Sequence, residues 1–164
     1  MKKIPYYPSR WEAIKELLKI YVPNSGERIV DLGSGDARVL TTLALRYDDI
    51  RLVGVEKDPK LVLASNRRIR RLNLANIDIL QQDLFKYPIT RENIDTIYAY
   101  LTKDALRMLK PKLQEFIKND GLIILLDFKI PGLKPDLKTT IKGLDEIHKL
   151  FIYGNKRRLR QINL

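Results

Sequence analysis

The stretch Arg28–Leu40, "RIVDLGSGDARVL", decides the fold. An apolar run that contains one acid leads into Gly33 and Gly35, and apolar residues at helical spacing follow. A buried strand, a glycine turn and a helix in this order are typical of the first unit of a parallel α/β sheet. Because glycine has no Cβ, the backbone of such a turn can approach a ligand closely. The stretch therefore predicts both a fold class and a ligand site.

Strand and helix patterns alternate on both sides of this stretch. Strands are expected at 28–32, 50–56, 76–80, within 93–101 and at 122–128. Helices are expected over 11–21, from about 37 to 45, from 59 to about 74, and from 103 to about 121 with a kink at Pro111. Ser9 and Glu12 predict a capping box before the first helix, while Asp36 and Thr102 predict caps of later helices.

This alternation predicts an α/β fold, namely a Rossmann-like, doubly wound, mostly parallel sheet with helices on both faces. The C-terminal residues 138–144 and 148–155 have strand character without a helix between them. We therefore expect an antiparallel pair at the C-terminal edge of the sheet. Since no linker-like tract interrupts the pattern, residues 1–164 are expected to form a single domain.

Composition excludes several classes of function. The chain has no Cys and a single His, His148, which argues against a thiol nucleophile, a zinc site or a histidine-based triad, so no metal is expected. The N-terminus lacks the pattern of a secretory signal, and no apolar stretch is long enough to span a bilayer. We expect a cytoplasmic monomer without a membrane partner.

The formal net charge of +11 favours contact with polyanions. The basic residues gather in two runs: Arg67, Arg68, Arg70 and Arg71, and Lys156, Arg157, Arg158 and Arg160. Nucleic-acid binding is one interpretation of these runs. A solvated, lysine-rich surface of the kind common in proteins from hot environments is the other, and the charge alone does not decide between them.

The glycine turn does not suit a pyrophosphate. Arg38 stands where the dinucleotide fingerprint needs a third small residue, and no Gly-Lys-Ser/Thr follows as a P-loop would require. Asp31, two residues before the first glycine, would repel phosphate at the end of a strand. A carboxylate at that place suits a ligand that presents an ammonium group.

Acids also mark the ends of the next two expected strands: Glu56 closes one, and Asp83 follows the other. Glu56 could accept both hydroxyls of a ribose, and Asp83 could accept from an exocyclic amine. The implied ligand is a nucleoside with an ammonium group and little negative charge, which S-adenosylmethionine fits; the alternative is three ordinary strand-end acids. The candidate cofactor residues are Asp31, Gly33, Ser34, Gly35, Glu56, Lys57, Asp83, Leu84 and Tyr98.

Three segments resemble the motifs of class I S-adenosylmethionine-dependent methyltransferases: "VDLGSGDAR" (30–38), "LVGVEKDP" (52–59) and "QQDLF" (81–85). Together with the first of these, "PYYPSR" (5–10) and "LTKDALRMLKPKLQEF" (101–116) resemble the small archaeal broad-specificity protein-lysine methyltransferases. That family is related to a mitochondrial lysine methyltransferase family and distantly to the Dot1 histone methyltransferases. The sequence departs from its pattern at Ala37, where the family usually has glycine.

The resemblance implies methyl transfer from S-adenosylmethionine to the side-chain amines of protein lysines, with broad specificity. It also implies that residues 1–26 cap the cofactor site. A lysine must lose its proton before it attacks, and a dry channel with aromatic walls favours the neutral amine. The candidates for these walls are Tyr98, Tyr100 and Tyr6, then Tyr7 and Phe128. No dedicated general base is evident.

Two alternatives remain open at this point. An RNA or DNA methyltransferase would use the same cofactor site. Base amino-group methyltransferases usually carry Asn/Asp/Ser-Pro-Pro-aromatic after the fourth strand, whereas this chain has "YAYLTK" (98–103), which argues against an exocyclic amine but not against other RNA atoms. A catalytically inactive nucleic-acid-binding domain on the same fold is the second alternative, and the acids at three strand ends oppose it.

Overall fold

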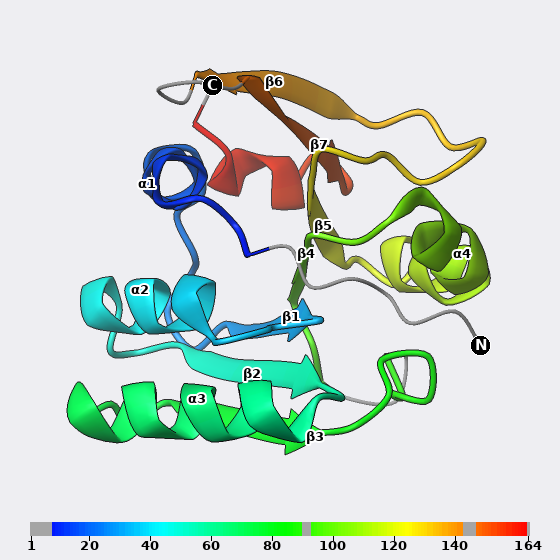
Figure 1. Cartoon of the computed structure of the whole chain (residues 1–164). Coiled ribbons are helices and arrows are strands. Elements are labelled where there is room, and N and C mark those ends of the chain that lie inside the picture. The colour runs from blue at the N-terminus through cyan, green and yellow to red at the C-terminus, as the bar shows by residue number, and fades with distance from the viewer. Residues whose placement is uncertain (1–7, 90–92, 143–146, 164) are drawn as a thin grey trace.

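One mixed sheet organises the computed structural model, which describes residues 8–89, 93–142 and 147–163 (Figure 1). Its strands are β1 (Arg28–Leu32), β2 (Arg51–Glu56), β3 (Ile77–Gln81), β4 (Thr96–Ala99), β5 (Leu122–Leu126), β6 (Leu137–Lys142) and β7 (Ile147–Tyr153). The helices are α1 (Trp11–Ile20), α2 (Arg38–Arg46), α3 (Pro59–Arg71), α4 (Lys103–Lys118) and the 3₁₀ helix η1 (Arg158–Gln161).

The seven strands lie in the order β3-β2-β1-β4-β5-β7-β6. The first five in this order are parallel, while β7 is antiparallel to both β5 and β6. This topology confirms the predicted doubly wound sheet with an antiparallel C-terminal edge pair. The direction of winding reverses between β1 and β4, which is where ligands bind in open α/β sheets.

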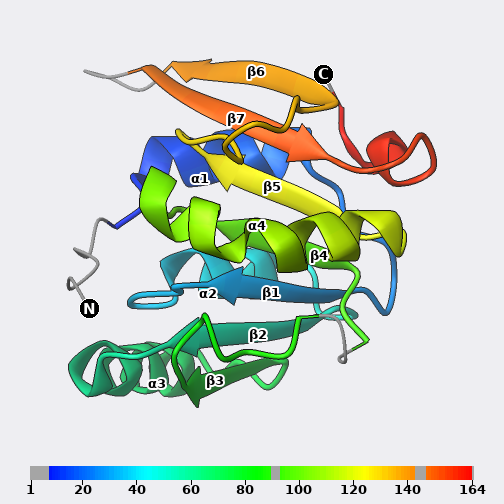
Figure 2. The ribbon, with the colours of Figure 1, turned by 90° about the vertical axis from the view of Figure 1, so that its right-hand side faces the viewer.

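Helices cover both faces of the sheet. Helices α1, α2 and α3 lie on one face, and α4 covers the other, which is turned toward the viewer in Figure 2. Successive strand residues alternate between these two layers, so Ile29 packs toward α1 and α2 whereas Val30 packs toward α4. The central strands therefore read as continuous apolar runs, as β5 does with all five residues buried.

Two of the predicted helix caps are wrong. The N-cap of α1 is Arg10, which makes no side-chain cap hydrogen bond within the described chain, and Ser9 bonds elsewhere, so no capping box forms with Glu12. The N-cap of α2 is Ala37 rather than Asp36. Both Ser9 and Asp36 have tertiary partners that are described below, and these take the place of the local bonds.

The cap of α4 was predicted correctly. The Thr102 hydroxyl accepts a hydrogen bond from the Ala105 amide at 3.3 Å, and α4 continues through Pro111 to Lys118. The sequence did not draw attention to Asp58, which caps α3 by accepting from the Lys60 amide at 2.9 Å. The strand that the sequence predicts at 122–128 ends earlier, at Leu126, because the backbone turns at Asp127.

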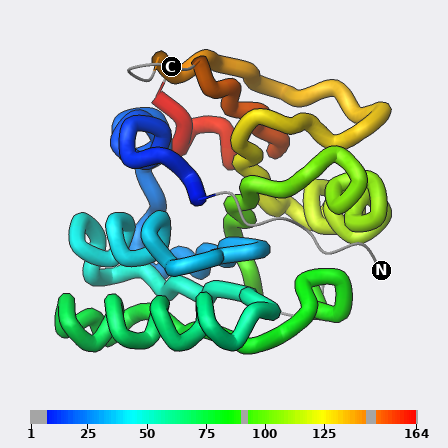
Figure 3. Tube along the Cα trace, in the orientation of Figure 1, coloured from blue at the N-terminus to red at the C-terminus, as the bar shows by residue number. Residues whose placement is uncertain are grey.

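The C-terminal segment returns to the start of the chain, and Figure 3 shows η1 beside α1. Tyr21 forms an antiparallel bridge with Ile162. The buried carboxylate of Glu27 accepts from Tyr21, Thr96 and Gln161, which joins α1, β4 and η1 around one fully hydrogen-bonded acid. Across the described ranges, no helix has the length and apolar content that crossing a membrane would need.

Candidate functional site

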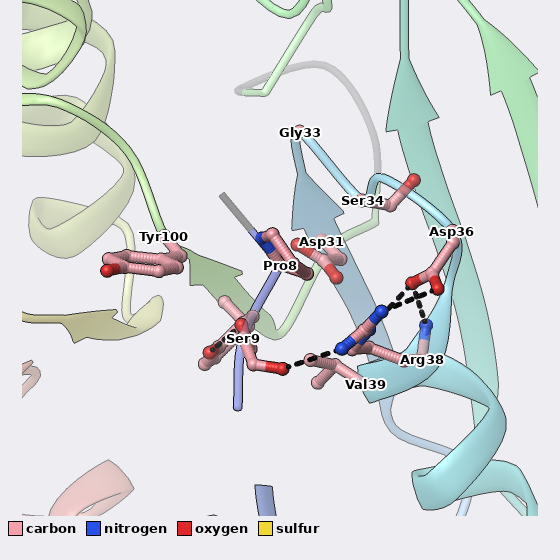
Figure 4. A pocket seen from close by; sticks show the side chains of 10 residues that line it. Pro8, Ser9, Asp31, Gly33, Ser34, Asp36, Arg38, Val39 and Tyr100 are labelled. Carbon is pink, nitrogen blue, oxygen red and sulfur yellow. Dashed lines mark hydrogen bonds and ion pairs between the residues drawn. The ribbon is translucent and has the colours of Figure 1, made fainter. Parts of the chain in front are cut away.

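A pocket opens at the carboxyl ends of β1 and β4, where the direction of winding reverses. Three parts of the chain line it: Pro8 with Ser9, residues of the loop from Asp31 to Val39, and Tyr98 with Tyr100. In Figure 4 the side chain of Asp31 lies between Pro8 and the loop that begins at Gly33. The structure thus brings together an acid, a glycine turn and two tyrosines that the sequence had marked separately.

Asp31 is the most unusual group in this pocket. It is the fourth residue of the central strand β1 and is only 3% exposed. Burial, followed by the charges of Glu56 and Asp36, raises the pKa of Asp31 to about 8. The carboxyl group therefore keeps its proton near neutral pH when no cation lies beside it. A cation bound beside it would favour the ionised form, so this position suits an ammonium group.

The glycine turn is shaped by its backbone. Gly33 has φ 82° and Gly35 has φ 57°, both in the left-handed region. A Cβ at Gly33 would lie 3.2 Å from Leu101 Cδ2 and 3.7 Å from Leu84 Cδ2, so the turn is also closely packed. Ala37 adopts φ 57° as well, a conformation that glycine accepts more readily than alanine.

Glu56 is fixed at the end of β2 by backbone donors. Its Oε2 accepts from the Gly35 amide at 2.9 Å, and its Oε1 accepts from the amides of Lys57 at 2.8 Å and Asp58 at 2.9 Å. These bonds join the ends of β1 and β2 through one carboxylate. Because a carboxylate offers about four acceptor positions, Glu56 retains capacity for a ligand hydroxyl.

The third acid lies at the outer end of this row. Asp83 Oδ1 accepts from the Phe85 amide at 3.0 Å, and Oδ2 lies 3.4 Å from Lys57 Nζ. The side chain of Lys57 is 69% exposed, so this ion pair adds little stability. Leu84 packs beside Gly33. The three acids follow adjacent strands as expected, although Glu56 and Asp83 do not line the pocket itself.

Tyr98 is the most deeply placed aromatic group of the pocket, with 4% exposure. Its hydroxyl lies 3.1 Å from Ser9 Oγ. Burial raises the pKa of Tyr98 well above its ordinary value, and the Ser9 bond only partly opposes this. Tyr98 therefore remains a neutral phenol and can donate a hydrogen bond.

The other predicted aromatic groups have mixed outcomes. Tyr100 follows β4 and lines the same pocket, half-buried. Phe128 is also half-buried, and Lys103 Nζ lies 5.7 Å from its ring centroid. Tyr6 and Tyr7 lie outside the described residues.

The sequence did not reveal a cluster that joins α1 to the motif loop. Asp36 pairs with Arg38 at 2.9 Å and with Arg68 at 2.8 Å, and both guanidinium groups stack over Trp11 at 5.4 and 5.9 Å. Although burial acts against it, these two arginines lower the pKa of Asp36 below its ordinary value. Arg38 also donates to the Ser9 carbonyl at 3.3 Å. The cluster thus holds the start of α1 against the pocket.

Apart from Arg68, which pairs with the pocket-lining Asp36, the basic residues of the two runs do not line the pocket. Arg158 is bound by Asp95 at 2.9 Å and by the Asp120 carbonyl at 2.6 Å. These acids directly precede β4 and β5, so the C-terminal run lies at the amino edge of the sheet, opposite the pocket. The last turn of α3, with Arg70 and Arg71, leads into the start of β3 at the same edge.

The family whose model matches this chain and two of its relatives are methyltransferases. The family model for the ANTKMT methyltransferase domain matches residues 31–137. A protein-lysine N-methyltransferase of Saccharolobus islandicus (strain REY15A) is 26% identical over 159 residues, which cover 92% of each chain. A ribosomal protein L11 methyltransferase of Thermosipho africanus (strain TCF52B) is 33% identical over 122 residues, covering 73% of this chain and 45% of the relative.

The fold also matches a solved structure over nearly its whole length. The crystal structure of an RNA methyltransferase from Salinibacter ruber, in complex with S-adenosyl-L-homocysteine, superposes with a TM-score of 0.77 at 23% identity. The match covers 92% of this chain and 95% of the other. At this level of identity the likeness establishes the shared fold, and the substrate has to be argued from the site.

Proposed function

The chain belongs to the ANTKMT methyltransferase domain family, and on that premise we propose that it methylates the side-chain amines of protein lysines with broad specificity. It is an S-adenosylmethionine-dependent methyltransferase. When bound, this cofactor supplies a methyl group on a positively charged sulfur. The substrate class is argued from the residues that line the pocket.

The pocket fits this cofactor by the chemistry of its groups. Asp31 offers a buried carboxylate to the amino group of the cofactor, and Gly33, with φ 82°, turns the backbone of the loop beside it. Glu56 and Asp83, at the ends of β2 and β3, suit the ribose hydroxyls and the adenine amine. The candidate residues Ser34, Gly35, Lys57 and Leu84 surround these groups, and their roles remain predictions.

The single observation that carries the lysine assignment is the pairing of Tyr98 and Tyr100 with Asp31 in one pocket. Aromatic walls exclude water and so favour a neutral amine, and their faces tolerate methylated ammonium products. The lysine methyltransferase relative, which aligns with 92% of this chain, supports the same substrate class. The residues after Tyr98 contain neither the amide nor the prolines typical of base amino-group methyltransferases.

A nucleic-acid substrate has weaker support. Its strongest argument is the charge of +11, but the last turn of α3 and the C-terminal run lie at the sheet edge opposite the pocket, Arg68 is paired with Asp36, and Arg158 is bonded to Asp95 and to the Asp120 carbonyl. An inactive domain is opposed by Asp31, because a buried carboxyl in a central strand costs stability that a spent site has no reason to keep.

Methyl transfer from labelled S-adenosylmethionine to a mixture of proteins and RNA tests the proposal. We expect label that protease removes and nuclease does not, located on lysine by mass spectrometry. The matched control is Asp31→Asn, which keeps the size of the side chain and should abolish labelling. Label that nuclease removes, and that survives protease, would instead establish the nucleic-acid substrate.

A further inference from the structure

We propose that Asp127, at the carboxyl end of β5, binds the amine of the incoming substrate lysine and accepts its proton. This inference rests on the proposed function, because it assigns a substrate-binding residue next to the same pocket, outside its described lining. The sequence had given no general base, and Asp127 belongs to none of the motifs that mark the cofactor site.

The backbone at Asp127 is the first observation. Its φ is 63°, and the Phe128 amide donates to the Leu126 carbonyl at 2.8 Å, which closes a three-residue turn around it. Three-residue turns with positive φ at the central residue are rare and strained. Strained residues of this kind cluster at functional sites, where the surrounding structure holds them in place. Here the strain fixes a carboxylate at the end of a central strand.

The surroundings of the carboxylate are the second observation. Asp127 Oδ1 accepts from the Lys149 amide at 3.0 Å, and Oδ2 lies 2.8 Å from His148 Nδ1. The Asp127 amide donates to the Lys149 carbonyl at 2.7 Å. The His148 side chain is 6% exposed, whereas the Asp127 side chain is 20% exposed. Two groups of β7 therefore fix the Asp127 carboxylate, which is still partly exposed to solvent.

The third observation places Asp127 beside the pocket tyrosines. Asp31 and Asp127 are both close enough to the buried Tyr98 phenol to raise its pKa, as does Tyr100. The parallel pairing of β4 with β5 sets Tyr98 against Ile124, so the end of β5 lies next to the end of β4. Two acids thus lie on, or directly after, the strands on either side of β4, and the cofactor amine is assigned to only one of them, Asp31.

The proton balance gives Asp127 its role. A lysine reaches the site as an ammonium ion, and it attacks only after losing a proton. In the proposed step an N–H bond of the ammonium breaks and an O–H bond forms on Asp127. The electron pair stays on the lysine nitrogen, and the His148 imidazole, whose Nδ1–H donates to Oδ2, holds the carboxylate in place for the transfer. Asp127 is the catalytic residue in this step, and His148 is a positioning residue behind it.

The test is Asp127→Asn. Asparagine tolerates positive φ and keeps an oxygen acceptor for the Lys149 amide, so the turn should persist while the charge is lost. We expect kcat/KM for the protein substrate to fall about 100-fold, the scale of lost general-base catalysis, with an unchanged cofactor Kd. The control is Asp136→Asn, which changes an exposed acid that accepts from the Gly154 amide and should leave kcat/KM unchanged.

His148 variants separate positioning from mere packing. His148→Asn retains an N–H donor toward Asp127 and should keep most of kcat, whereas His148→Leu should lose it as Asp127→Asn does. Equal activity of the asparagine and leucine variants would contradict the positioning role.

The two proposals fail in different ways. Wild-type kcat/KM in Asp127→Asn, with lysines still labelled, would overturn the role of Asp127 and leave the lysine activity standing. Absence of lysine labelling by the wild-type protein, with the cofactor bound, would overturn both.

Discussion

Asp31 is the residue at which stability and function oppose each other. Its pKa of about 8 in the folded protein compares with about 4 in an unfolded chain. Between these two values the folded state binds the proton more tightly, so stability falls as the pH rises through this window. Without a bound cation, the ionised Asp31 carboxylate therefore lowers the stability of the cofactor-free protein.

We predict that Asp31→Asn stabilises the cofactor-free protein at pH 8 by about 1–3 kcal/mol, because the amide carries no charge to bury. At pH 4.5 the gain should shrink, since this pH lies only about half a unit above the pKa of an unfolded aspartate and most of the difference between the two states has not yet developed. Urea unfolding at both pH values measures the difference. Asp78→Asn, at an exposed position of β3, is the control and should show no such dependence. A wild-type protein equally stable at both pH values would contradict the prediction.

The same pKa predicts how cofactor binding responds to pH. An ammonium group pairs with ionised Asp31, so below pH 8 binding must release a proton. The cofactor Kd should fall roughly tenfold for each pH unit between 6 and 8 and then level off. Calorimetry in two buffers with different ionisation heats counts the released proton directly. Asp31→Asn should bind weakly and without this release; binding with no proton release in the wild type would place the ammonium group elsewhere.

The residues of this site differ in how far the sequence could predict them. Asp31, Glu56 and Asp83 were found because each lies at or just after the end of an expected strand, and parallel strands end at one edge. Ser9 was misread as a cap because its partner, Tyr98, lies 89 residues away. Asp127 had no signal either, since its strained turn and its bond to His148 depend on the pairing of β5 with β7.

At the scale of elements, the attachment of α1 replaces the missing helix cap. The Ser9 hydroxyl bonds to Tyr98 on β4, while Arg38 and Arg68 stack over Trp11. Helical spacing predicted where α1 runs, since apolar residues recur on one face. It could not predict what holds the first turn, because those contacts come from β4, α2 and α3.

We predict that Ser9→Ala and Tyr98→Phe each lower the free energy of unfolding by about 1 kcal/mol, the usual net contribution of a hydrogen bond. In the double variant the losses should fall short of the sum by about 0.5–1.5 kcal/mol, because the two groups share one bond. Urea unfolding of all four proteins gives this coupling. Thr102→Ala combined with Ser9→Ala is the control pair and should be additive. Additive losses in the Ser9–Tyr98 cycle would show that the bond contributes nothing.

The close packing of β2 under the motif loop yields another prediction. A Cβ at Gly54 would lie 2.6 Å from Ser34 Oγ and 2.7 Å from Ile79 Cδ1. Gly54→Ala should therefore destabilise the protein by about 1–3 kcal/mol through overpacking. Because Ser34 belongs to the loop, cofactor affinity should fall as well. Arg51→Ala, at the exposed start of the same strand, serves as the control, and a Gly54→Ala protein with wild-type stability would contradict the packing argument.

Across the whole molecule, the positive charge follows the direction of the helices. Basic residues occupy the last turns of α1, α2, α3 and α4, where they complement the negative end of the helix dipole. Helices that follow parallel strands return toward the amino edge of the sheet, so these charges collect there. The sequence predicted the runs but not this location, since their distance from the pocket depends on the topology.

The exposed residues Arg67, Arg70 and Arg71 provide the test at this scale. Changing all three to Gln should leave lysine methylation unchanged, because the end of α3 lies away from the pocket. Any binding of nucleic acid through this surface should lose salt dependence, with the slope of log K against log[salt] reduced by about 2–3 units for duplex DNA. Arg68→Gln is the contrasting variant: it breaks the ion pair with Asp36 at 2.8 Å and should lower stability instead. If methylation fell together with the salt slope, Arg67, Arg70 and Arg71 would contribute to substrate binding. That result would support an RNA substrate.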